Sequence, residues 1–132
     1  MKSIHLIIAA LVLVFVISSC TKKPEVSFTV NKTTAAVNEE ITATSTSTDA
    51  NEYSWFFYEG IVASVQEGSS TSHVTEITEW KECGNTTMTF KFDSVGTYTV
   101  LLKACNWRGG CPFKESGTSG FCDEATEIIT IQ

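Results

Sequence analysis

The stretch DSVGTYTVLLKAC, residues 93–105, decides the fold of this chain. Asp, Ser and Gly at its start favour a tight turn, and the residues that follow alternate between the two sides of an extended backbone. One side consists of Tyr98, Val100, Leu102 and Ala104. Side chains on one face of a strand recur every second residue, so the pattern predicts a β-strand over Thr97–Cys105 that buries one face.

The same alternation recurs along the chain, and few segments have the periodicity of a helix. Thr, Val, Ile and aromatic residues alternate with polar ones, and Gly, Asn, Asp and Ser separate the runs. This pattern predicts an all-β antiparallel β-sandwich of about seven or eight strands. The expected strands are Glu25–Val30, Glu39–Thr46, Glu52–Tyr58, Ile61–Gln66, Val74–Trp80, Thr86–Phe92, Thr97–Cys105 and Glu124–Ile131. Further residues expected to face the core are Tyr53, Trp55, Phe57, Met88, Phe90 and Phe92.

The N-terminal sequence MKSIHLIIAALVLVFVISSC has the layout of a secretory signal. Its apolar run, from Ile4 to Ile17, is shorter than the roughly 20 residues of a membrane-spanning helix. The final ISSC resembles the bacterial lipobox, which consists of an aliphatic residue, two small residues and a cysteine. That resemblance implies removal of the signal and attachment of diacylglycerol and a further acyl chain, such as palmitate, at Cys20.

These features divide the chain into three parts. We expect a signal peptide over residues 1–19, a lipidated tether over residues 20–24 and a single domain over residues 25–132. The exported part has eight lysines and arginines against fifteen aspartates and glutamates, because Lys2 is the only one of these charged residues that the signal contains. Such an acidic surface repels phosphate backbones, so we expect no nucleic-acid partner.

Four cysteines remain besides Cys20: Cys83, Cys105, Cys111 and Cys122. An even number of cysteines in an exported chain predicts two disulfides, for which three pairings are open. Their C-x5-C and C-x10-C spacings lack the close C-x2-C pairs of zinc sites, and no redox C-x-x-C is present. We therefore expect neither a metal nor a cofactor.

Three motifs resemble those of polycystic-kidney-disease (PKD) repeats. DSVGTYTV, residues 93–100, is similar to the turn and strand that close such repeats, and the final EIITIQ is similar to their last strand. YSWFFYEG, residues 53–60, keeps Trp55, Phe57 and Gly60 of the family's Y-x-W-D-F-G-D-G and replaces three other residues. The resemblance implies an immunoglobulin-like sandwich of a mostly non-catalytic kind found in surface proteins. It also implies that Tyr98 is a tyrosine-corner residue, whose hydroxyl bonds to nearby backbone.

In an immunoglobulin-like topology the four cysteines lie at one end of the sandwich. The preferred pairing is Cys105–Cys122 with Cys83–Cys111, and the chief rival is Cys105–Cys111 with Cys83–Cys122. The preferred pairing places Glu127 opposite the inward-facing Val100, and a bulge in the last strand would relieve this conflict.

The loop between the last two strands carries the candidate binding residues. They are Trp107, Arg108, Phe113 and Phe121. Aromatic residues on a stapled loop can anchor a partner, and the alternative is that they cover the disulfides and cap the core. Only four residues separate Cys20 from the first expected strand, so a tether of about 17 Å would keep this end near the membrane.

No pattern of catalytic residues stands out. The exported part contains one histidine, His73, and within residues 20–132 there is no G-x-S-x-G or Ser-x-x-Lys motif that would mark a serine nucleophile beside it. Asp49, Asn51 and Glu52 could offer oxygen ligands to calcium, but they lack EF-hand spacing. We therefore expect a protein that is not an enzyme.

Three functions are compatible with these observations. The first is a lipid-anchored envelope module, on the outer membrane, that binds a protein or a glycan. The second is a structural subunit of an envelope assembly. The third is a small inhibitor of a periplasmic hydrolase, although the loop motif of the envelope lysozyme inhibitors is not found in this sequence.

Overall fold

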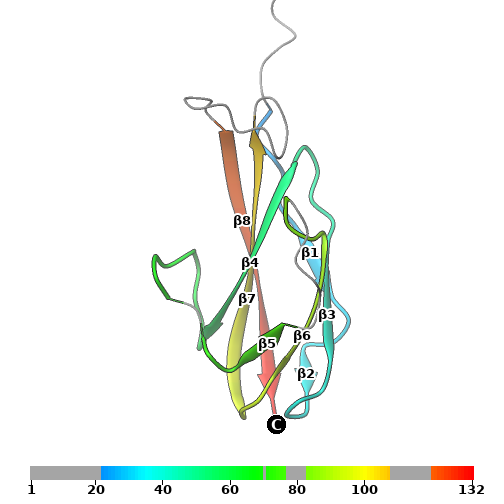
Figure 1. The fold of residues 1–132 in the computed structure, drawn as a ribbon, viewed down its shortest axis with the longest axis vertical. Helices are drawn as coiled ribbons and strands as arrows, with labels where there is room; N and C mark the ends of the chain where they lie inside the picture. The colour runs from blue at the N-terminus through cyan, green and yellow to red at the C-terminus, as the bar shows by residue number, and fades with distance from the viewer. Residues whose placement is uncertain (1–21, 70, 77–82, 108–119) are drawn as a thin grey trace, which may run out of the picture.

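The computed structural model describes residues 22–69, 71–76, 83–107 and 120–132, and over these residues the chain is all-β. Eight strands form two four-stranded sheets that pack face to face (Figure 1). One sheet has the order β1 (Phe28–Val30), β3 (Ile41–Ser45), β6 (Thr87–Phe92) and β5 (Val74–Glu76). The other has the order β2 (Thr34–Ala35), β8 (Gly120–Ile131), β7 (Gly96–Trp107) and β4 (Glu52–Glu59). The predicted β-sandwich is thereby confirmed.

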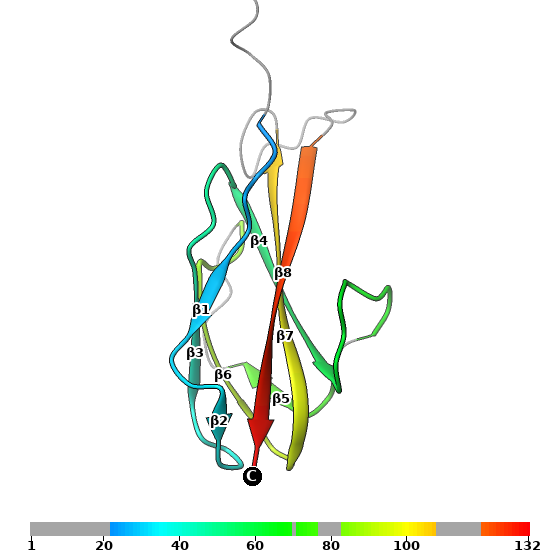
Figure 2. The same cartoon turned by 180° about the vertical axis from the view of Figure 1, so that it is seen from behind.

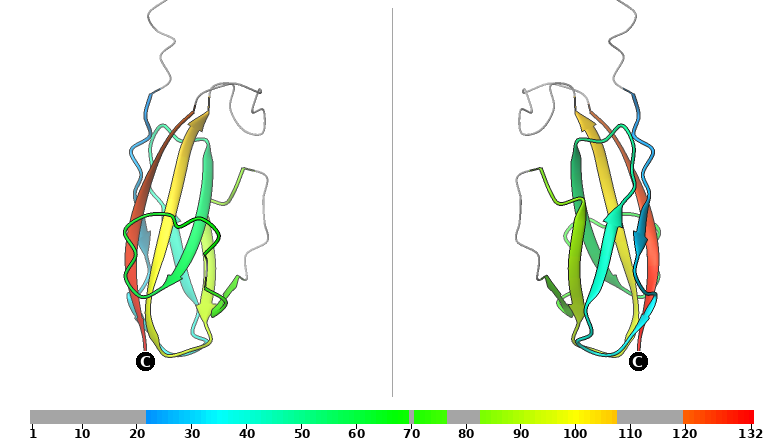
Figure 3. Two further views of the ribbon diagram at one scale, coloured as in Figure 1. Left: turned by 90° about the vertical axis from the view of Figure 1, so that its left-hand side faces the viewer. Right: turned by 90° about the vertical axis from the view of Figure 1, so that its right-hand side faces the viewer.

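The N-terminal strands switch between the sheets. β1 pairs with β3, whereas β2, a few residues later, pairs with the end of β8 as the one parallel pair among the described strands. Figure 2 shows the chain crossing at this point, and Figure 3 shows the two layers edge-on. The two-residue β2 was not predicted, because it is too short to show any alternation.

The two sheets enclose an aromatic core. The fully buried cluster consists of Ala35, Ile41, Ala43, Phe57, Met88, Phe90, Phe92, Tyr98, Val100, Ile129 and Ile131. The rings of Phe92 and Tyr98 stack with their centroids 4.0 Å apart, and Phe57 lies 4.8 Å from Phe90. The Tyr98 hydroxyl donates to the backbone carbonyl of Ser94 at 2.9 Å, as expected of a tyrosine corner, and burial raises the pKa of this phenol.

β7 and β8 pair without interruption from Gly96 opposite Ile131 to Trp107 opposite Gly120. The expected conflict between Glu127 and Val100 exists, since the two residues lie directly opposite one another. The expected bulge is absent from this ladder. Glu127 is only partly buried, so its methylene groups can lie along the core while its carboxylate reaches water.

The predicted strand over Ile61–Gln66 is wrong, because this segment is a loop that crosses the outer face of β7 (Figure 3, left). Gly60 and Gly68, with φ of 77° and 74°, turn the chain at its two ends. The backbone amides of this loop donate hydrogen bonds to side chains instead of pairing with a neighbouring strand. The Thr99 hydroxyl donates to the Gly60 carbonyl at 2.7 Å and accepts from the Val62 amide at 3.0 Å.

This loop explains a departure from simple alternation. Thr99 and Leu101 lie on the outer face of β7, yet both are fully buried. Tyr58, on the same face of β4, is only 3% exposed, and its hydroxyl accepts from the Gln66 amide at 3.1 Å. The outer face of the sheet is therefore covered around Tyr58, Thr99 and Leu101, whereas the outward-facing Ile128 of β8 is 42% exposed.

The other strand predictions differ from the structure mainly at their ends. β8 begins at Gly120, four residues before the predicted start, and β7 continues two residues further, to Trp107. β5 is described up to Glu76, and the rest of the predicted Val74–Trp80 strand lies outside the described residues. Within the described ranges, no helix is long and apolar enough to cross a bilayer.

Candidate functional site

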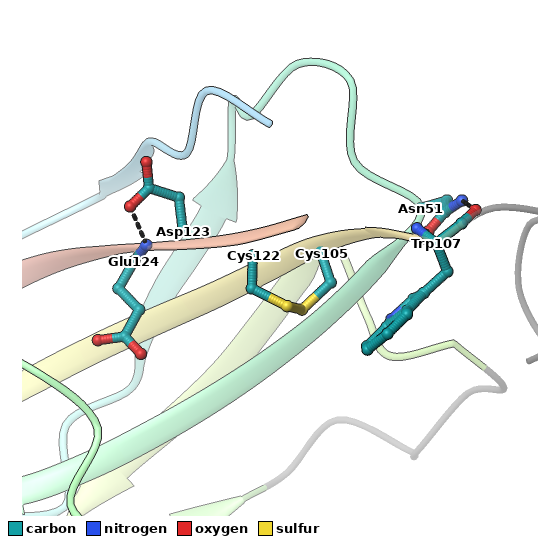
Figure 4. The surroundings of a disulfide bond; sticks show 6 residues. All are labelled: Asn51, Cys105, Trp107, Cys122, Asp123 and Glu124. Carbon is teal, nitrogen blue, oxygen red and sulfur yellow. Dashed lines mark hydrogen bonds between the residues drawn. A yellow bond between two sulfur atoms is a disulfide. The ribbon is translucent and has the colours of Figure 1, made fainter. Parts of the chain in front are cut away.

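A disulfide joins the two longest strands near one end of the sandwich (Figure 4). Cys105 in β7 and Cys122 in β8 are directly opposite in register, with their Cα atoms 4.0 Å apart. The preferred Cys105–Cys122 pairing is therefore present, and the rival pairing is wrong. The bond lies on the outer face of the sheet, so it fastens two neighbouring strands rather than linking the two sheets.

Cys83 lies at the same end. It is disulfide-bonded as well, and its expected partner, Cys111, lies outside the described residues. Its carbonyl accepts from the Tyr53 amide at the start of β4, at 3.1 Å. The next residue, Gly84, has a φ of 77° and sits so close to β4 that an added Cβ would lie 1.8 Å from the Tyr53 carbonyl oxygen.

Trp107 is held in place beside the disulfide. Its backbone amide donates to the Asn51 side-chain oxygen at 3.0 Å, and the Asn51 amide group donates back to the Trp107 carbonyl at 2.9 Å (Figure 4). Its indole lies over Gly120, where an added Cβ would be 2.2 Å from the ring carbon Cε3. Trp107 therefore caps the end of the β7–β8 ladder and is only partly exposed.

Two of the four residues expected in the loop between the last two strands lie in strands instead, because Trp107 ends β7 and Phe121 is the second residue of β8. Phe121, 47% exposed, is the more accessible of the two. Arg108 and Phe113 lie outside the described residues. The packing of Trp107 over Gly120 fits the second interpretation given above, in which the aromatic residues cover the disulfides and cap the core instead of binding a partner.

The first described residues are clamped to this same end. Lys22 pairs with Asp49 at 2.6 Å, and Lys23 pairs with Asp123 at 2.8 Å. The Asn106 side-chain amide donates to the Lys22 carbonyl at 2.9 Å. Lys22 and Lys23 therefore lie against the domain, and their two ion pairs, with Asp49 and Asp123, are called the clamp below.

The two ion pairs of the clamp shift the pKa values of two of their members. The hydrogen bond to Asp49 raises the pKa of Lys22, and the hydrogen bond from Lys23 lowers the pKa of Asp123. Asp49 and Asn51, two of the three oxygen ligands considered for calcium, are engaged by the clamp and by Trp107. Among the described residues, no group of three or more His, Cys, Asp or Glu side chains could hold a metal ion.

His73 belongs to a cluster that the sequence did not reveal. Its Nδ1 lies 2.9 Å from an Asp93 carboxylate oxygen and 3.2 Å from the Ser94 hydroxyl, which also donates to Asp93 at 3.0 Å. The hydrogen bond from His73 lowers the pKa of Asp93. A catalytic triad places serine and aspartate on opposite ring nitrogens, whereas here both contact Nδ1. This cluster fastens the start of β5 to the β6–β7 turn and has no relay geometry.

A polar hollow of about 320 Å³ lies beside this cluster. It is lined by Tyr58, Glu59, Val62, Gln66, Ser69, Thr71, Ser72 and His73. These residues come from the end of β4 and from the chain that leads from β4 to β5. Sequence reasoning missed this hollow, because it depends on how the loop returns to β4.

Comparison of the chain with protein-family models, with curated proteins and with solved structures gives no match.

Proposed function

We propose that this chain is a lipid-anchored, non-catalytic module of the bacterial cell envelope that binds a protein or glycan partner. In this proposal Cys20 carries the lipid, and the domain is a PKD-like, immunoglobulin-like sandwich on the outer membrane. The observation that carries the proposal is the clamp of Lys22 and Lys23 on the disulfide end of the sandwich.

With a lipid at Cys20, the clamp would fix which end of the domain lies nearest the membrane. Two residues of extended chain span no more than about 7 Å, so the acyl chains would lie close to Asp49 and the β7–β8 end. Each buried lipid methylene contributes about 0.8 kcal/mol, so two or more chains give a durable anchor. The long axis of the sandwich would then stand away from the bilayer, because the tether enters at one end and the β6–β7 turn lies at the other (Figure 1).

Two features support a PKD-like binding module. The Tyr98–Ser94 hydrogen bond closes a tyrosine corner in the motif that carries the resemblance. The one histidine of the described chain is used to fasten a turn, in a geometry unlike that of a nucleophilic relay. Both features suit a rigid scaffold that presents loops.

Metabolic labelling tests the anchor. Cells that produce the full-length chain are grown with a palmitate analogue that can be detected after purification. We expect the label on the wild-type protein and on a Cys83→Ser control, and its loss from Cys20→Ser together with release of that variant from the membrane fraction. An unlabelled, membrane-free wild-type protein would refute the proposal, and cross-linking in intact cells would identify the partner.

A further inference from the structure

We propose that the polar hollow beside His73 binds an uncharged sugar unit of a glycan. This inference rests on the proposed binding function and names its ligand class and its place in the fold.

Hydrogen bonds hold the described backbone around the hollow. The Thr71 amide donates to the Phe57 carbonyl at 2.8 Å, which returns the loop to β4. The Gln66 amide donates to the Tyr58 hydroxyl at 3.1 Å, and the Val65 amide donates to the Glu124 carboxylate at 3.0 Å. These bonds shape the hollow before any ligand arrives, so binding does not require the loop to fold around it.

The lining offers hydrogen-bonding groups that the domain does not use. All lining residues except Val62 have polar side chains. The side chains of Glu59, Gln66, Ser69 and Ser72 form no hydrogen bond with another residue in the described part of the chain. His73 uses Nδ1 for the Asp93 cluster, which leaves its Nε2 for a ligand.

The composition of the lining excludes the common charged ligands. It contains no lysine or arginine, and its one histidine, His73, is already paired with the Asp93 carboxylate, so the lining offers a phosphate or a carboxylate no dedicated cationic partner. It contains a single carboxylate, Glu59, whereas calcium takes six to eight oxygen ligands and usually several carboxylates. A lysine or arginine side chain of a partner protein only donates hydrogen bonds and would leave the donors of the lining unused.

Sugar hydroxyls fit this lining better than those ligands. Serine hydroxyls and the glutamine amide both donate and accept hydrogen bonds, as sugar hydroxyls do. The volume of about 320 Å³ lies at the lower end of the range for ligand pockets, which suits a sugar unit at a chain end. Hydrolysis of a glycosidic bond would require two carboxyl groups, and Glu59 is the only one in the lining, so the site binds without cleaving.

The position of the hollow suits a glycan outside the lipid. Tyr58 and Glu59 are at the end of β4, whereas the clamp is near its start, where Glu52 lies opposite Cys105. The 60–69 loop projects from the side of the sandwich, away from the end where the tether enters (Figure 1). A domain anchored at the clamp therefore leaves the hollow open to the surroundings.

Titration of the mature acylated protein in detergent tests the site. The probes are short neutral oligosaccharides of glucose, galactose, mannose or N-acetylglucosamine, and the readout is the dissociation constant from calorimetry. We expect one of them to bind, Glu59→Ala to weaken binding at least about fivefold through loss of one net hydrogen bond, and Ser72→Tyr to abolish binding by filling the hollow. Glu40→Gln, an exposed charge change outside the lining, is the matched control and keeps full affinity.

Several results would overturn the inference. They are no binding by any probe, equal affinity in both hollow variants and the control, or tighter binding of oligolysine than of every sugar. Each variant is first checked for wild-type circular dichroism and melting temperature, and the two substitutions are independent tests if one of them fails to fold. The experiment also separates this inference from the anchor, because sugar binding does not require acylation and a failed sugar titration leaves the palmitate result intact.

Discussion

Replacing Gly120 by alanine should destabilise the disulfide end through a single steric conflict. The added Cβ would lie 2.2 Å from Cε3 of Trp107 and 2.6 Å from both Cδ2 and Cζ3, far inside van der Waals contact. The indole must move, although the Asn51 side chain holds the backbone of Trp107 through hydrogen bonds to both its amide and its carbonyl. Overpacking of this kind typically costs about 1–3 kcal/mol, so we expect the free energy of unfolding to fall by that amount.

A double-mutant cycle isolates this conflict. In a Trp107→Ala background the obstacle is gone, and Gly120→Ala should then be neutral or stabilising by about 0.5–1 kcal/mol, since alanine loses less backbone entropy on folding than glycine does. Urea unfolding followed by far-UV circular dichroism measures both effects without relying on tryptophan fluorescence. Gly68→Ala is a useful control, because its cost comes from a φ of 74° with no neighbouring atom within 4 Å and should not depend on Trp107. An equal cost of Gly120→Ala in both backgrounds would refute the reasoning.

Three further predictions concern the disulfide, the Lys23–Asp123 ion pair and the loop that Thr99 holds. Replacing Cys105 and Cys122 by alanine should lower the free energy of unfolding by about 3 kcal/mol, measured in urea, and an unchanged midpoint would show that the bond does not stabilise the fold. The pKa of Asp123 is lowered in the folded state, so its contribution to the free energy of unfolding is present above the unfolded-state pKa and is lost as the pH falls through the folded-state pKa. An NMR titration should show the lowered pKa in the wild type and a smaller shift in Lys23→Gln. Thr99→Val should cost about 1–3 kcal/mol in urea unfolding, because it removes both loop hydrogen bonds of a fully buried hydroxyl, and a neutral result would mean that the loop is held elsewhere.

The sequence predicted the strands and the core well where burial follows a two-residue period. The inward faces of β6 and β7 were predicted from that period, and packing against the opposite sheet makes it visible in the sequence. The same reasoning failed for Ile61–Gln66, whose apolar residues suggested a strand. The segment instead satisfies its backbone through the Thr99 hydroxyl and the Glu124 carboxylate, and such long-range bonds leave no local pattern.

The candidate sites were less predictable than the fold. The preferred Cys105–Cys122 pairing followed from strand topology. The clamp could not be foreseen, because Lys23 meets Asp123 only once segments from opposite ends of the sequence lie together. The His73 cluster and the hollow beside it depend in the same way on a loop that returns to the end of β4.

Most of β8 is an edge strand, and this affects the tendency of the protein to aggregate. In the described part of the chain only the last two residues of β8 have a strand, β2, on their other side, so the backbone of Gly120–Ile129 forms an open sheet edge there. Such edges invite edge-to-edge aggregation with a second molecule. β8 carries Glu124 and Glu127 along this edge, besides Asp123, which is paired with Lys23. Carboxylates on an edge strand discourage pairing with a second copy, so they act as gatekeepers against edge-to-edge aggregation.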